Sequence, residues 1–254
     1  MGECILNKIQ QLSPSQTDKL KKEIVKILSL GLDITGELVE IALESVYPKA
    51  TRLTLNTKDK RWIDVILPSK GIEVKTFQVA KSLNFISVGT QVSNVLKRVS
   101  KVEHLEANGN RRDATAVGKD IIDYLHSTIS EHAAQKGIEG ELSMGVLFRT
   151  VNKEHFAYWE QELHFGNYMD YEWSWNITQN NNKTTYTVVG KKDGEFIFRW
   201  YCENQKLLFY TFDVPNDAVF FNINQSEANK KAFIVTDEEL QAMIDEEIAR
   251  RGRK

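Results

Sequence analysis

The stretch RWIDVILPSKGIEVKTF, residues 61–77, holds the pattern from which the expected fold follows. Two short runs rich in Ile and Val flank Pro68-Ser69-Lys70-Gly71, a composition typical of two strands joined by a tight turn. Each run also carries charge where a buried strand would ordinarily place apolar side chains, at Asp64, Glu73 and Lys75. These three charges are therefore the first candidates for a functional site.

Strand geometry predicts how the charges are arranged. Glu73 and Lys75 are two residues apart, so they share one face of their strand. If the strands pair antiparallel through a turn at 68–71, Asp64 is expected at the level of Lys75 or one pair beyond it. Two carboxylates and an ammonium at one point suit Mg²⁺, which takes one or two carboxylates and leaves room for a substrate phosphate. Such a group is typical of phosphodiester hydrolysis by metal-activated water.

A helix rich in glutamate is expected just before these strands. The segment TGELVEIALES, residues 35–45, has Glu37, Glu40 and Glu44 at spacings of three and four, so they form one stripe along the helix. Such a stripe usually faces water. Its position in the chain also allows one of the glutamates to join the three charges of the hairpin.

A helix with Glu, a strand with Asp, a turn and a strand with Glu-x-Lys resembles the PD-(D/E)XK nuclease superfamily, above all the type II restriction endonucleases. The resemblance covers roughly residues 35–78 and departs from the family pattern at Ile63, where the family's name implies Pro. It implies a restriction-endonuclease-like mixed β-sheet core flanked by helices. It also implies Mg²⁺ as the cofactor and double-stranded DNA as the substrate.

The resemblance further implies a role for each site residue. Asp64 and Glu73 would be the metal ligands and Lys75 the catalytic lysine. Glu40 would assist as a fourth catalytic residue, because GELVE at 36–40 is similar to the family's Gly-x-x-x-Glu helix start. Glu37 is the reserve candidate for that role.

The remaining patterns predict an α/β (α+β) chain with a β-rich C-terminal half. Two domains are expected: a nuclease core over 1–155, and a β-rich extension over 156–254, part of the same compact unit, that ends in a helix opening near Thr236 and serves DNA recognition or dimerisation. Within these domains the expected helices are 14–30, 35–46, 88–102 and 118–137, and the expected strands are 52–56, 61–67, 71–78 and 141–151, followed by an antiparallel meander after 155.

The formal net charge of −2 gives no overall attraction to nucleic acid, but polar and basic residues cluster locally. Asn and Gln have the geometry to bind adenine edges, and Lys and Arg bind phosphates. Two arginines lie in a Gly- and Asn-flanked segment that is expected to be a mobile basic loop. The candidate DNA-binding residues are Gln78, Lys81, Asn84, Gln91, Asn94, Lys97, Arg98, Arg111 and Arg112.

The composition of the chain and the motifs missing from it argue against several classes of protein. No apolar run is long enough to cross a bilayer and no signal peptide is evident, so a cytoplasmic protein without membrane contact is expected. Cys4 and Cys202 form no paired motif and are expected to be free thiols. The five histidines lack metal-binding spacing, and nucleotide-binding glycine motifs are missing from the sequence.

Three functions remain open at this point. The first is a Mg²⁺-dependent, site-specific double-stranded DNA endonuclease of a restriction system, working as a homodimer so that each subunit addresses one strand. The second is a repair, junction-resolving or RNA-processing nuclease of the same fold. The third is a non-catalytic nucleic-acid-binding or protein-binding module in which the charges of the hairpin only pair with one another.

Overall fold

The computed structural model describes residues 11–52, 62–180, 183–224, 241–242 and 245. The chain divides into two compact units, each made of separate segments. Unit 1 combines 1–86, 136–162 and 217–254, and unit 2 combines 87–135 and 163–216. Within the described residues, no helix has both the length and the apolar character needed to cross a membrane.

Unit 1 contains a six-stranded mixed sheet in the order β1-β2-β3-β5-β6-β11. Only β3 and β5 pair in parallel; all other neighbours are antiparallel. The parallel pair places Glu73 beside Met144 and Lys75 beside Val146. The strands are β1 (Thr51–Arg52), β2 (Val65–Leu67), β3 (Lys70–Gln78), β5 (Glu141–Arg149), β6 (His155–Glu162) and β11 (Val219–Asn222).

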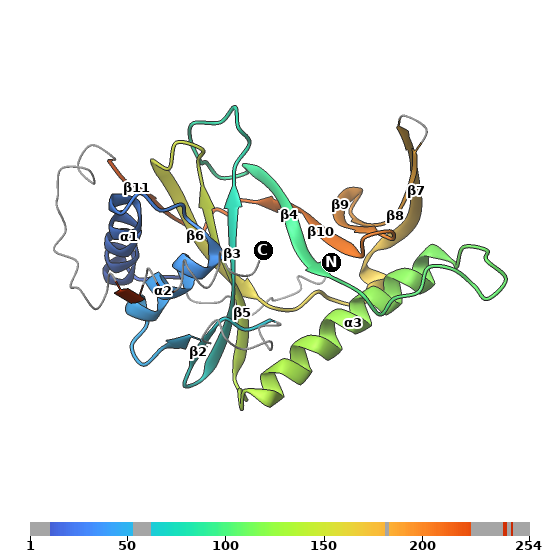
Figure 1. Ribbon diagram of the computed structural model, residues 1–254, viewed down its shortest axis with the longest axis horizontal. Coiled ribbons are helices and arrows are strands. Elements are labelled where there is room, and N and C mark those ends of the chain that lie inside the picture. Colours follow the sequence, from blue (N-terminus) through green and yellow to red (C-terminus); the bar gives the residue numbers. More distant parts are fainter. Residues whose placement is uncertain (1–10, 53–61, 181–182, 225–240, 243–244, 246–254) are drawn as a thin grey trace. The chain divides into compact units, whose positions relative to one another are not determined.

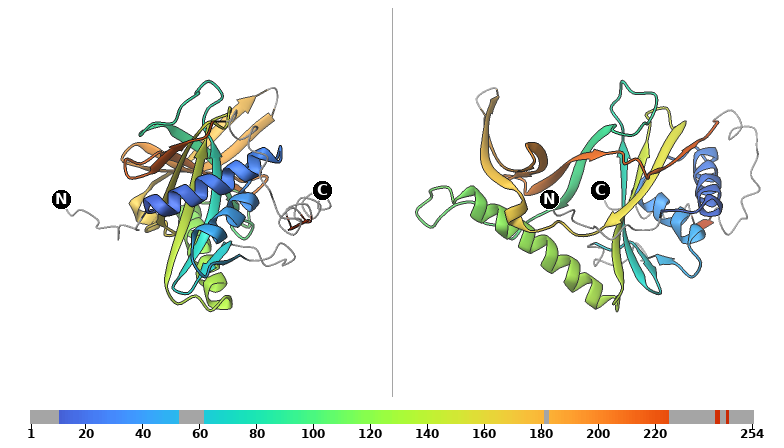
Figure 2. Two further views of the ribbon diagram at one scale, coloured as in Figure 1. Left: turned by 90° about the vertical axis from the view of Figure 1, so that its left-hand side faces the viewer. Right: turned by 180° about the vertical axis from the view of Figure 1, so that it is seen from behind.

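Two helices cover one face of this sheet. Helix α1 (Pro14–Ser29) begins with a capping box formed by Ser13 and Gln16, and α2 (Gly36–Val46) begins at an N-cap from Thr35. Their apolar faces pack with Ile72, Val74 and residues of β5, β6 and β11 in one buried cluster. Figure 1 shows both helices in blue beside the sheet, and the left panel of Figure 2 shows them in front of it.

Unit 2 contains a five-stranded antiparallel sheet in the order β4-β10-β9-β8-β7. The long helix α3 (Ala114–Gln135) packs on β7 and β8, with Trp173 between its Gly118 and Gly190 of β8. The remaining elements are β4 (Gln91–Arg98), the 3-10 turn η1 (Tyr168–Asp170), β7 (Glu172–Asn180), β8 (Lys183–Lys192), β9 (Glu195–Tyr201) and β10 (Lys206–Asp213).

The α+β class is confirmed, together with the first two helices, the hairpin strands, the helix now seen as α3, and the buried strand β5. The helix expected at 88–102 is wrong, because Gln91–Arg98 forms strand β4. A bulge lies near Leu96, where Leu207 pairs with Lys97 and Leu208 with Val95. It interrupts the strand's two-residue alternation, so Val92, Leu96 and Val99 are all buried at spacings that imitate a helix.

The units also differ from the expected domains. The boundary predicted at residue 155 falls at the start of β6, inside unit 1. Residues 87–135, assigned to the core by sequence, belong to unit 2 instead. Strand 52–56 lies mostly outside the described residues, as do the opening of the terminal helix at Thr236 and Cys4. Cys202 is a buried free thiol.

Candidate functional site

The β2–β3 hairpin sets the register of the predicted site. Leu67 pairs with Lys70, so the turn consists of Pro68 and Ser69 alone. Lys70 and Gly71, expected in the turn, belong to β3. Asp64 lies just before β2, and its backbone N–H donates to the carbonyl of Ile72, which already pairs with Val65, so regular pairing stops at Val65. The register of the strands is therefore shifted by two residues from the expected one, because the turn is shorter than predicted, and Asp64 contacts Ile72 and Val74 rather than lying at the level of Lys75.

Asp64 ends the pairing of the two strands. Its backbone N–H donates to the carbonyl of Ile72 over 2.8 Å, while its own Oδ2 accepts from the backbone N–H of Val74 over 2.7 Å. Asp64 lies just before β2 begins at Val65, while β3 continues to Gln78. The Asp64 carboxylate thus takes the place of a strand carbonyl as the partner of the Val74 N–H. A backbone bond to a buried carboxylate fixes the position of that side chain.

Lys75 connects the other charged side chains. Its Nζ forms an ion pair with Oε1 of Glu73. Burial lowers the pKa of Lys75, but the Glu73 carboxylate, with smaller contributions from Asp64 and Glu40, outweighs burial and holds that pKa above its ordinary value of 10.5. The ammonium is therefore charged and within electrostatic reach of all three carboxylates.

Helix α2 supplies the fourth residue. Glu37 and Glu44 are half-buried, whereas Glu40 is only 5% exposed. It lies on α2 among buried apolar side chains such as Val39 and Leu43. Glu40 is thus the glutamate of the stripe that the fold draws inward, and its charge acts on Lys75. The structure brings together Asp64, Glu73, Lys75 and Glu40 from one helix and one hairpin.

The chemistry of this donor set fits a hard divalent cation. Within the described part of the chain, no group of three or more His, Cys, Asp or Glu residues has the arrangement of a preformed metal site. Mg²⁺ needs only one or two carboxylates, since water completes its coordination. Asp64 and Glu73, which are 7% and 2% exposed, offer two carboxylates, one just before β2 and one on β3. They are the residues that would hold such an ion.

A second polar cluster lies in unit 1 and was missed by sequence reasoning. Glu160 of β6 is buried and accepts hydrogen bonds from the hydroxyls of Tyr47, of Tyr158 over 2.7 Å and of Ser143 over 3.2 Å, and pairs with the ammonium of Lys70. Burial and the nearby carboxylate raise the pKa of both tyrosines. Both hydroxyls therefore stay protonated and donate to Glu160.

One feature of the sequence indicates this second cluster. A glutamate in the middle of the aromatic run FAYWEQELHF, residues 156–165, is unusual for a buried strand. Its partners come from three other parts of the chain, so spacing alone did not reveal them. The cluster joins the C-cap of α2 with β3, β5 and β6 by satisfied polar contacts, which is a stabilising arrangement rather than a reactive one.

The predicted DNA-binding residues are divided between the two units. Gln78, Lys81 and Asn84 are exposed in unit 1, where Gln78 Oε1 accepts from Arg149 over 2.8 Å. The other six lie in unit 2: Gln91, Asn94, Lys97 and Arg98 on β4, and Arg111 and Arg112 before α3. Three of the nine residues thus belong to unit 1 and six to unit 2.

The two arginines are held more firmly than a mobile loop implies. The Arg111 guanidinium lies 3.6 Å from the centroid of the Tyr186 ring. Arg112 pairs with Asp120 over 2.8 Å and donates to the carbonyl of Glu103 over 2.7 Å, while its own carbonyl accepts from the Trp175 indole. Both arginines thus have partners within unit 2.

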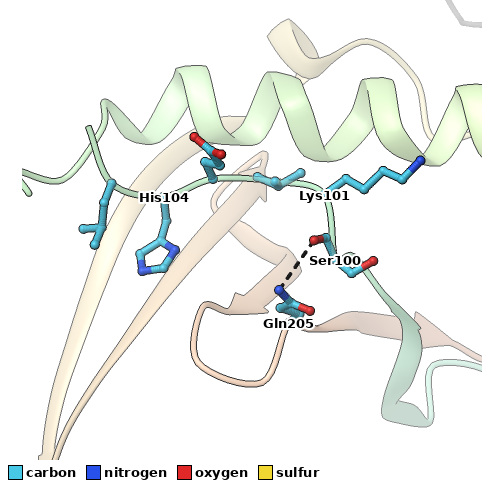
Figure 3. Close-up of a pocket in the computed structure, with 7 residues that line it drawn as sticks. Ser100, Lys101, His104 and Gln205 are labelled. Carbon is cyan, nitrogen blue, oxygen red and sulfur yellow. Dashed lines mark hydrogen bonds between the residues drawn. The ribbon is translucent and has the colours of Figure 1, made fainter. Parts of the chain in front are cut away.

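Unit 2 also has a pocket of about 390 Å³ beside the segment between β4 and α3. Its lining consists of residues 100–105 and Gln205, and Figure 3 shows Gln205 donating to the carbonyl of Ser100 over 3.5 Å. Burial and the charge of Arg111 lower the pKa of His104 in this lining, which favours its neutral form. None of the residues predicted for catalysis or DNA binding lines this pocket.

Comparison of the chain with protein-family models, with curated proteins and with solved structures finds no match.

Proposed function

We propose that the protein is a Mg²⁺-dependent, site-specific endonuclease that hydrolyses double-stranded DNA, of the type II restriction kind. One observation carries the proposal: Lys75 pairs with Glu73 on a strand whose Val74 N–H binds the Asp64 carboxylate, and the buried Glu40 of α2 also acts on the Lys75 charge. These are the four residues singled out from sequence. The mixed sheet with α2 beside the hairpin is compatible with the restriction-endonuclease-like core that the resemblance implies.

Each residue has a separate role in this proposal. Asp64 and Glu73 would hold Mg²⁺, which when bound would polarise the scissile phosphate and activate water. Lys75 keeps its positive charge at neutral pH and stabilises the negative charge that develops on the phosphate. Glu40 helps keep the ammonium charged. As a homodimer, the protein would direct one such site at each strand of a palindromic target.

The test is cleavage of a large unmodified DNA by the purified protein, with Mg²⁺ and with EDTA. Wild type is expected to give discrete fragments with Mg²⁺ only. Lys75→Ala is expected to lower the cleavage rate by at least a hundredfold, since it removes a charge aimed at the transition state. Lys22→Ala is the matched control, because Lys22 is exposed on α1 of the same unit and its loss should leave the rate unchanged.

The products also separate the alternatives. Fragments whose ends share one sequence would support a site-specific enzyme. Cleavage restricted to branched DNA or to RNA would replace the proposal with a repair, junction-resolving or RNA-processing nuclease. A folded wild-type protein that gives no product with Mg²⁺ or Mn²⁺ on any of these substrates would contradict a nuclease function.

A further inference from the structure

The hairpin of β7 and β8 is longer than the sheet to which it belongs. Its strands pair from Glu172 and Lys191 to Asn180 and Lys183. Strand β9, by contrast, pairs with β8 only from Thr187 onward. Residues 178–180 and 183–185 therefore form a two-stranded ribbon that extends beyond the third strand, and we call it the distal ribbon. Figure 1 shows its strands in brown, beyond the end of β9.

One face of the distal ribbon is entirely polar. Thr178 pairs with Thr185, and Asn180 pairs with Lys183, so these four side chains share a face. Thr178, Asn180 and Lys183 are exposed, and Thr185 is half-buried. All four can donate hydrogen bonds, and the amide and hydroxyl groups can also accept them. A surface of this composition is suited to a polar partner that offers both donors and acceptors.

The charge of the distal ribbon favours an anionic partner. Lys183 is the only charged residue in 178–185, in a chain whose formal net charge is −2. Lys183 pairs with Glu203 over 3.0 Å, but both side chains are well exposed, at 69% and 45%, so this pair is weak and easily exchanged. The guanidinium of Arg111, stacked on Tyr186 at the base of the ribbon, adds a further positive charge.

We propose that the distal ribbon enters the major groove of duplex DNA and reads its bases. The groove is about 12 Å wide and admits a two-stranded β-ribbon. The Asn180 amide matches the donor and acceptor pair of adenine, the threonine hydroxyls can bind any base, and Lys183 binds a phosphate or a guanine. The choice of duplex DNA rests on the proposed function, but the ribbon's binding can be measured without any cleavage.

The test uses the full chain with Lys75→Ala, in EDTA, so that DNA is bound but not cut. Selection from a random duplex library is expected to enrich one sequence, and anisotropy titrations then compare that duplex with a scrambled one. Asn180→Ala is expected to weaken binding of the selected duplex about tenfold and leave the scrambled duplex unchanged. Lys183→Ala should weaken both duplexes and lower the slope of log K against log salt by about 0.9.

Lys192→Ala is the matched control, because it removes the same charge at the base of the same hairpin and should change neither titration. Thermal unfolding of every variant verifies that its fold is retained. Binding that is unchanged by Asn180→Ala and Lys183→Ala would overturn the inference, as would a preference for single strands or RNA, or selection without any enriched sequence. If the wild type binds duplex DNA through the ribbon but never cleaves it, the DNA-binding role of the ribbon is supported and the proposed nuclease function is contradicted.

Discussion

At the scale of single residues, the two charged clusters of unit 1 differ in how far the sequence revealed them. Asp64, Glu73 and Lys75 interrupt apolar strand runs within 12 residues of one another, so a local pattern was enough to link them. The register of the hairpin was predicted wrongly because the turn has two residues rather than four. Glu160 finds its partners at Tyr47, Lys70 and Ser143, which no sequence spacing connects.

The Glu160 cluster leads to a prediction about stability. Lys70→Met should lower the free energy of unfolding by about 3 kcal/mol, because it leaves a buried carboxylate without its ammonium. The double variant Lys70→Met/Glu160→Gln should recover much of that loss, since no buried charge then remains. Urea unfolding at neutral pH measures both, with Lys22→Met on exposed α1 as the control. A double variant less stable than Lys70→Met would show that the carboxylate itself is needed.

At the scale of elements, α3 and β4 show when a hydrophobic pattern distinguishes a helix from a strand and when it does not. The apolar positions of α3 follow a helical period, contain no competing β-rich run, and were assigned correctly. The segment at 88–102 has five valines, whose branched side chains favour strands. Its burial period is helical only because of the bulge near Leu96. The bulge depends on how β4 pairs with β10, so it could not be predicted from the sequence of β4 alone.

The contact between α3 and β7 gives a prediction in which two effects oppose each other. In an exposed helix Gly→Ala stabilises by about 1 kcal/mol through helix propensity. At Gly118, however, a new Cβ would lie 2.1 Å from Cδ2 of Trp173, and both atoms belong to packed elements. We therefore expect Gly118→Ala to destabilise the protein by about 1–3 kcal/mol, as overpacking does.

Urea unfolding followed by tryptophan fluorescence measures the effect of Gly118→Ala. Ser127→Ala, at an exposed position of the same helix, is the control and should change stability by less than about 0.5 kcal/mol. An increase in stability at Gly118 would mean that Trp173 moves aside at little cost. The close packing between α3 and the β7–β8 hairpin would then not be a determinant of this unit's stability.

At the scale of the whole molecule, the chain passes repeatedly between the two units. Strands β3 and β5 are parallel neighbours, yet Gln78 and Glu141 are separated by the 62 residues that contain β4 and α3. A second segment, 163–216, completes unit 2 before the chain returns to form β11. The change of composition at residue 155 predicts one domain boundary there. Composition does not show which distant segments pack together. A core made of three separate segments, such as unit 1, could therefore not be recognised from composition.

Binding of Mg²⁺ at the hairpin should raise the stability of the whole protein. A ligand that binds only the folded state stabilises it by about 2.7 kcal/mol at a concentration about 100 times its Kd. For a chain of this size that corresponds to a rise in Tm of roughly 5 to 10 °C. We expect Mg²⁺ to raise the Tm of wild type by this amount when it nears saturation. Differential scanning calorimetry at constant ionic strength measures the rise.

The variants distinguish a site at the hairpin from general cation binding. Asp64→Asn and Glu73→Gln should lose the Mg²⁺-dependent rise in Tm, whereas Asp18→Asn, exposed on α1, should retain it. Lys75→Ala should show a larger rise than wild type, because the ammonium no longer repels the cation or competes with it for Glu73. An equal rise in wild type and Asp64→Asn would place Mg²⁺ elsewhere. The charges of the hairpin would then act only to pair with one another.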